Sequence, residues 1–81
     1  MKHFVYVLTS LKDGKLYTGF SSNPERRLKE HNSGKTTSLF KRRPLMIIYK
    51  EECVNELEAR RRERFLKTGQ GRKFLKSVLS R

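Results

Sequence analysis

Residues 3 to 9 constrain the fold more than any other stretch of this sequence. They read His-Phe-Val-Tyr-Val-Leu-Thr. β-Branched, aromatic or aliphatic side chains occupy both the odd-numbered and the even-numbered positions of this run. Because successive side chains of a strand point to opposite faces of a sheet, this run predicts a strand that is covered on both sides. We therefore expect it to be the central strand. The 81 residues are enough for one small domain, which we place at residues 1–81.

A tight turn follows the first strand. Leu11-Lys12-Asp13-Gly14 supplies turn chemistry, and residues 15–20 read as the returning strand of a hairpin. If those four residues form the loop, Tyr17 lies opposite Leu8, and Tyr6 becomes its diagonal neighbour on one face, roughly 7–8 Å away. A two-residue turn would keep both tyrosines on one face but separate them by two more residues along the strand.

Capping residues predict two helices beyond the hairpin. Asn23 can cap free amide groups and Pro24 suits a first helical position, so a helix is expected from Pro24 to residue 30 or 31. Asn55 and Glu58 have capping-box spacing and predict a second helix to about Lys67.

The remaining segments are read from composition and periodicity. Residues 33–44 contain small hydroxyl residues, four basic residues and no acid, and we interpret them as a mobile basic loop. Residues 45–49, Leu-Met-Ile-Ile-Tyr, predict a third strand, and we interpret Tyr49 as a packing residue. A break at residues 68–71 precedes a last helix, which we expect to run through residue 80.

Positive charge dominates the composition. Twenty Lys and Arg against eight Asp and Glu give a formal net charge of +12, and such mutual repulsion is best explained by a polyanionic partner. No apolar run could span a bilayer and no signal-peptide pattern is present, so we expect a soluble, cytoplasmic protein that binds nucleic acid and no membrane. The single Cys53, read as a small core residue, agrees with a reducing compartment. Too few Cys and His are present for a structural zinc site, so any metal should have oxygen ligands.

Glu63 is the most informative acid. At ~100° per residue of helix, Ala59, Glu63 and Leu66 fall within ~60° of one another, so the carboxylate borders an apolar face. One interpretation is a surface ion pair with Arg60 or Lys67, a turn away. The other is a ligand for Mg²⁺ on a phosphate-binding surface, with water and substrate oxygens completing the metal shell.

Arg27 and His31 are neighbours on one helix face, four residues apart. Arg27 offers a planar charged fork that matches phosphate oxygens, although an arginine in so basic a chain can also be merely solvated. His31 can carry a proton near neutral pH, contact phosphate, or cap the carboxyl end of its helix. Tyr6 and Tyr17 are either packing residues or phenols whose proton balance is shifted by nearby cations.

The other basic residues are interpreted as phosphate contacts, which contribute affinity without sequence information. A solvated surface is the alternative for any one of them. The set comprises Lys35, Lys41, Arg42, Arg43, the Arg60–Arg62 run, Arg64 and Lys67.

Four segments together resemble the GIY-YIG nuclease superfamily, and in particular its small stand-alone bacterial members. They are Val5-Tyr6-Val7, Tyr17-Thr18-Gly19, Arg27 to His31, and Ala59 to Glu63. The resemblance covers nearly the whole chain. It implies an α/β (α+β) fold with a three-stranded antiparallel sheet, a central first strand, and flanking helices.

The resemblance also implies a one-metal cleavage of phosphodiester bonds that uses Mg²⁺ or Mn²⁺. On this chain, Tyr6 and Tyr17 would position or deprotonate the attacking water, and Arg27 would hold the scissile phosphate. Glu63 would bind the metal. His31 would assist proton transfer or bind phosphate.

Gly19 retains the glycine of the second tyrosine motif, where a side chain would crowd the tyrosines. Three positions of the two tyrosine motifs depart from the pattern of the superfamily: Phe4 and Val5 replace the glycine and isoleucine of the first motif, and Thr18 replaces the isoleucine of the second. Some larger relatives have a further asparagine after the metal-binding helix, where this chain has Gln70-Gly71-Arg72, and that role is unassigned.

Three functions follow as hypotheses. The leading one is a monomeric, metal-dependent endonuclease that acts on DNA, including branched or damaged forms. The alternative is a non-catalytic nucleic-acid-binding module that retains the nuclease fold. An RNA-associated accessory protein is a third hypothesis, suggested by size and charge.

Overall fold

The first strand is central, as predicted. The computed structural model describes residues 2–80, except the side chains at positions 37, 38 and 40. In it, β1 (His3–Ser10) lies between β2 (Leu16–Ser21) and β3 (Leu45–Cys53), and both neighbours are antiparallel to it. The predicted α+β fold, with a three-stranded antiparallel sheet and flanking helices, is confirmed.

The hairpin has the register that a four-residue loop predicts. Tyr17 lies opposite Leu8, and Tyr6 lies opposite Gly19. The turn closes through a hydrogen bond of 2.8 Å from the Gly14 amide to the Ser10 carbonyl, and Gly14 has a φ of 73°, a conformation that suits glycine. Tyr6 and Tyr17 therefore share one face of the sheet.

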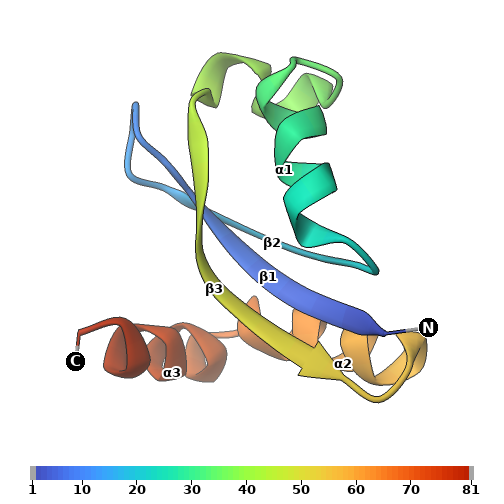
Figure 1. Cartoon of the computed structure of the whole chain (residues 1–81). Coiled ribbons are helices and arrows are strands. Elements are labelled where there is room, and N and C mark those ends of the chain that lie inside the picture. The colour runs from blue at the N-terminus through green and yellow to red at the C-terminus, as the bar shows by residue number, and fades with distance from the viewer. Residues whose placement is uncertain (1, 81) are drawn as a thin grey trace.

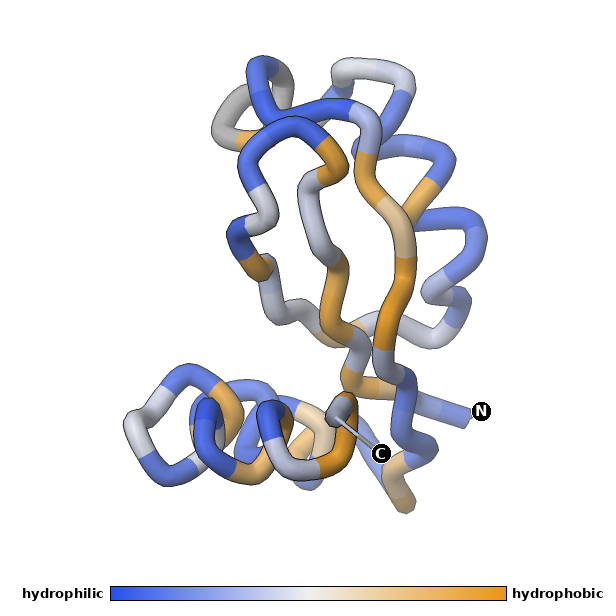
Figure 2. Tube along the Cα trace, turned by 90° about the vertical axis from the view of Figure 1, so that its left-hand side faces the viewer, coloured by the Kyte–Doolittle hydropathy of each residue, from blue (hydrophilic) through white to orange (hydrophobic). Residues whose placement is uncertain are grey.

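Two layers of helix cover the sheet, one on each face (Figure 1). On one face, α1 (Pro24–Asn32) and the 3₁₀ helix η1 (Thr37–Arg42) pack over Tyr6 and Leu8 through Leu28 and Leu39. Figure 2 shows the hydrophobic residues gathered along the strands, with hydrophilic residues along the outer side of α1.

The opposite face is covered by α2 (Glu56–Leu66) and α3 (Gly69–Leu79). Leu66 and Leu75 from these helices bury Val5 and Val7 of the central strand. Alternate residues of β1 thus enter two separate cores, which explains why the odd-numbered and the even-numbered positions of the strand are both apolar.

The helices begin at the predicted caps. Asn23 accepts a hydrogen bond from the Arg26 amide at 3.1 Å, and Asn55 accepts one from the Glu58 amide at 2.9 Å. The Glu58 carboxylate pairs with Arg61 at 3.3 Å. The expected break at residues 68–71 is shorter than predicted, because Thr68 caps α3 and the helix begins at Gly69.

The interpretation of residues 33–44 as a mobile loop is wrong for its second half. Residues Thr37–Arg42 form η1, and Leu39 is buried in the core. The third strand also continues to Cys53, beyond the predicted end at Tyr49, because residues 50–53 pair with the first half of β1. Tyr49 and Cys53 pack against the core next to Val5 and Val7, as predicted.

Candidate active site

Tyr6 lies at the centre of the candidate site. Its ring crosses the backbone of Gly19 on the edge strand β2, so a Cβ added at Gly19 would lie 2.7 Å from the Tyr6 hydroxyl and 3.3 Å from the Tyr17 ring. Any side chain there would displace the tyrosine. Glycine at position 19 is therefore required for the observed packing of both phenols.

His31 joins this cluster from the last turn of α1, and its ring is fully buried. Nε2 lies 3.2 Å from the Tyr6 hydroxyl, and Nδ1 lies 2.5 Å from the Oγ1 of Thr36. The edge of the Tyr17 ring packs against the imidazole at 5.4 Å between ring centroids. The imidazole thus bonds two side chains, not the terminal carbonyls of its helix. A buried ring also offers no surface to a phosphate, so proton transfer remains the proposed role.

Arg27 reaches the same hydroxyl from one turn earlier on α1. Its guanidinium hydrogen-bonds the Tyr6 phenol and forms an ion pair of 2.8 Å with Glu30. The Arg27 side chain is 40% exposed, so a ligand at the surface can reach the guanidinium while it remains in contact with Tyr6.

Burial shifts the pKa values of the two central groups in opposite directions. Desolvation raises the pKa of Tyr6, the hydrogen bond from Arg27 opposes this shift, and the charges of Tyr17 and Glu63 add to it. Desolvation and the Arg27 charge lower the pKa of His31, with partial compensation from Glu30. At neutral pH, Tyr6 is therefore a phenol and His31 a neutral imidazole.

These protonation states give the hydrogen-bond chain a direction. Arginine only donates, so the Tyr6 oxygen accepts from Arg27. The phenolic proton then points to Nε2 of His31, which must supply the lone pair. A neutral imidazole has one N–H, so Nδ1–H donates to Thr36. Thr36 was absent from the predicted site, because nothing in its hydroxyl-rich segment distinguishes it from its neighbours.

Glu63 approaches the cluster from the other layer of the fold. Helix α2 runs beside β2, where Arg60 lies 5.6 Å from the centre of the Phe20 ring. The Glu63 carboxylate is close enough to Tyr6 for its charge to raise the pKa of that phenol. It also forms an ion pair of 3.7 Å with Lys67, and its side chain is 23% exposed. Glu63 thus forms the ion pair of the first interpretation, and its charge also reaches the tyrosine cluster that the second interpretation requires.

The donor set around Glu63 suits only certain metals. Residues 2–80 contain no group of three or more His, Cys, Asp or Glu side chains arranged to hold a metal ion. A lone carboxylate beside phenols fits Mg²⁺ or Mn²⁺, since Mg²⁺ commonly keeps several waters and substrate phosphate oxygens in its shell.

The predicted phosphate contacts separate onto the two sides of the sheet. Arg60, Arg64 and Lys67 lie on α2, whereas Lys35, Lys41, Arg42 and Arg43 lie between α1 and β3. Arg42 pairs with Asp13 at 3.3 Å, and Arg60 pairs with Glu56 at 3.5 Å. Arg43 donates to the Asn32 carbonyl at 3.2 Å. The basic residues therefore fall into two groups, one on α2 and one between α1 and β3.

Comparison with known proteins is consistent with this geometry. The model of the GIY-YIG catalytic domain matches residues 2–75. A UPF0213 protein of Staphylococcus haemolyticus is 41% identical over 81 residues, covering 99% of this chain and 98% of that protein. A UPF0213 protein of Enterococcus faecalis is 47% identical over 64 residues, 75% of this chain and 72% of the other. The solution NMR structure of a UPF0213 protein from Bacillus halodurans aligns with a TM-score of 0.57 at 33% identity, covering 96% of this chain and 85% of that one.

Proposed function

Because this chain belongs to the GIY-YIG catalytic domain family, which implies a nuclease-type function, we propose that it is a metal-dependent endonuclease that cuts DNA. The observation that carries the proposal is the contact of the Tyr6 hydroxyl with both Arg27 and His31, with Glu63 close enough to act on its pKa. We propose a monomer that works in the cytoplasm on branched or damaged DNA.

Hydrolysis of a phosphodiester forms a bond from a water oxygen to phosphorus and breaks the bond to one sugar oxygen, which leaves with the electron pair of that bond and takes a proton from solvent water. In the proposal, Tyr6 takes a proton from the attacking water as its own proton moves to Nε2 of His31. Arg27 offers its exposed side to the phosphate, whose negative charge increases as the water attacks. Tyr17 packs against His31 and orients the water.

A divalent metal held by Glu63 would supply positive charge to the phosphate and lower the pKa of the attacking water. The residues proposed to act on the substrate are Tyr6, Tyr17, Arg27, His31 and Glu63. Lys35, Arg64 and the other exposed basic residues would contact phosphates along the strand.

The test is a cleavage assay on linear, flapped and four-way DNA, and on a matched RNA strand, with Mg²⁺, with Mn²⁺, and with a chelator. The proposal expects cutting of at least one DNA substrate that stops when the metal is removed. The ion pair between Glu63 and Lys67 favours the second candidate, a non-catalytic binding module, because it occupies the proposed metal ligand. Binding without metal-dependent cleavage of any substrate would support that candidate.

A further inference from the structure

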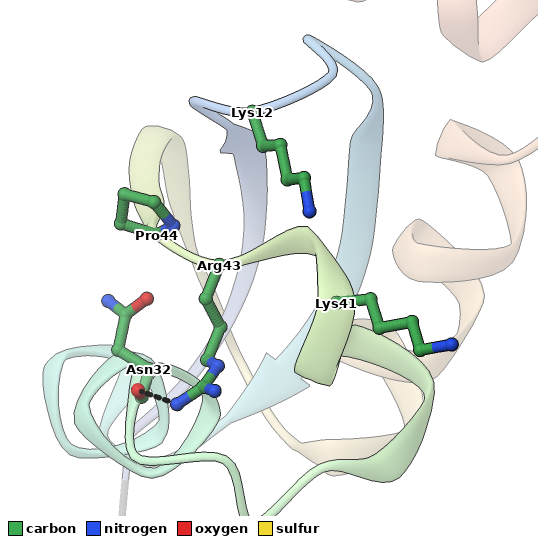
Figure 3. Close-up of a pocket in the computed structure, with 5 residues that line it drawn as sticks. All are labelled: Lys12, Asn32, Lys41, Arg43 and Pro44. Atoms are coloured by element: carbon green, nitrogen blue, oxygen red, sulfur yellow. Dashed lines mark hydrogen bonds between the residues drawn. The ribbon is translucent and has the colours of Figure 1, made fainter.

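A second basic feature lies away from the tyrosines, where the β1–β2 turn, the end of η1 and the start of β3 meet. It is a hollow of about 510 Å³ lined by Lys12, Asn32, Lys41, Arg43 and Pro44. Figure 3 shows Lys12 extending from the turn toward η1, and Arg43 reaching the carbonyl of Asn32. No acidic side chain lines this hollow within the described part of the chain.

The distribution of ion pairs leaves this hollow positively charged. The sequence has eight acids, and in residues 2–80 each of the eight pairs with a different basic residue. Lys12 and Lys41 belong to none of these pairs. Arg42, which lies beside the hollow, is instead paired with Asp13 at 3.3 Å. Part of the net charge of +12 is therefore concentrated here.

Hydrogen bonds to backbone atoms hold the walls of the hollow in place. The Asn32 side chain donates to the Leu45 carbonyl at 3.0 Å and accepts from the Leu45 amide at 2.8 Å. The Leu11 amide donates to the Pro44 carbonyl at 2.8 Å, and the Ser10 hydroxyl donates to the Arg42 carbonyl at 2.6 Å. Three segments distant in sequence are thus tied together without a ligand, which lowers the entropy lost on binding.

We propose that this hollow, which we call the basic hollow, binds one phosphate group of a nucleic-acid strand apart from the cutting centre. Arg43 supplies a guanidinium held by Asn32, and Lys12 and Lys41 have long flexible side chains that can turn toward a bound phosphate. The phosphate is either internal to the strand or a terminal 5′-phosphate. The inference rests on the proposed function for its substrate class, and it adds Lys12 to the residues that hold the strand.

The first test titrates inorganic phosphate into the ¹⁵N-labelled chain at low salt. The backbone amide signals of Lys12, Asn32, Lys41 and Arg43 are expected to shift together. Shifts confined to α2, or spread evenly over the basic residues, would overturn the proposal. This measurement uses the unmodified protein, so the folding of a variant does not affect it.

The second test compares Lys12→Gln/Lys41→Gln with Lys73→Gln/Lys76→Gln, which removes the same charge from two exposed positions of α3. Binding of a short single-stranded DNA is measured in chelator, so that no cleavage is needed. The first variant is expected to bind about 3- to 10-fold more weakly, with a salt slope about 0.7 smaller, as for one lost phosphate contact. Equal effects of the two variants would overturn the proposal.

Two forms of the oligonucleotide distinguish the sources of the phosphate. If the site holds a 5′-phosphate, the unmodified protein binds the phosphorylated strand more tightly than the 5′-hydroxyl strand, and Lys12→Gln/Lys41→Gln removes the difference. If it holds an internal phosphate, the variant weakens both strands equally. Cleavage by the unmodified protein is scored separately, so a loss of binding without any nuclease activity would support the basic hollow and contradict the proposed function.

Discussion

Replacing Thr36 with valine tests the direction of the hydrogen-bond chain. Valine has nearly the same shape as threonine but lacks the hydroxyl that accepts from His31. The His31 ring is fully buried, so one of its nitrogens would lose its partner without gaining water. A buried polar group left unpaired costs about 1–3 kcal/mol, and in a domain of this size each kcal/mol lowers Tm by roughly 4–8 °C.

The tautomer of His31 should change together with stability. In the unmodified protein the ring is expected to carry its proton on Nδ1, which donates to Thr36. In Thr36→Val, a lone pair facing a methyl group is less costly than a buried N–H, so the proton should move toward Nε2. That form cannot accept the proton of Tyr6, and the proposed proton transfer is lost.

The Tm is measured by thermal unfolding, and the tautomer of His31 is read from the ¹⁵N chemical shifts of its ring. Thr9→Val is the matched control, because Thr9 lies on β1 and its hydroxyl makes no hydrogen bond within residues 2–80. An Nε2–H tautomer in the unmodified protein, or Tm values equal for the two variants, would refute the reasoning.

Three further predictions follow from the same contacts. Arg27→Ala should lower the cleavage rate about 100- to 1,000-fold in a single-turnover assay, since charge at the phosphate is lost; a rate within twofold would contradict this role. Gly19→Ala should destabilise the fold by about 1–3 kcal/mol in urea unfolding, because the added methyl group overlaps Tyr6, whereas Gly69→Ala, with open space around it, should not. The fold lowers the pKa of His31, so the contribution of this residue to stability is complete above its unfolded pKa of about 6.5 and is lost as pH falls through the folded pKa. The Tm of the unmodified protein should therefore fall over this pH range. An equal fall in His31→Gln would contradict the prediction.

The sequence predicts the fold well where local chemistry is strong. Apolar residues at consecutive positions place β1 between two cores, and a four-residue turn ending in glycine sets Tyr17 opposite Leu8. Asn23 and Asn55 mark the helix starts, because each accepts a hydrogen bond from an amide that the helix leaves unpaired.

Tertiary contacts explain what sequence patterns did not predict. Leu39 and Phe40 stand alone among hydroxyl and basic side chains in the sequence, and only the burial of Leu39 beside Leu8 shows why η1 forms. Residues 50–53 are charged in part and lack strand periodicity, yet their backbones pair with β1. The pairing of Arg42 with Asp13 depends on the turn and η1 meeting in space.

In the candidate site, too, some contacts follow from local sequence and others depend on the tertiary structure. Helical spacing put Arg27 and His31 on one face of α1, and this suffices to bring both to Tyr6. The partner of the second imidazole nitrogen, Thr36, lies beyond the helix end, where no periodicity applies. Glu63 comes from the opposite layer, and helical angles alone could not show that its charge reaches Tyr6.

The central claim is that Glu63 completes a nuclease site with the cluster around Tyr6. The most direct measurement compares metal-dependent cleavage of branched DNA by the unmodified protein, by Glu63→Gln, and by Glu56→Gln as a control on the same helix. The account predicts that Glu63→Gln abolishes cutting while DNA binding in chelator persists, and that Glu56→Gln cuts normally. Unchanged cutting by Glu63→Gln would remove this carboxylate from the site and contradict the claim.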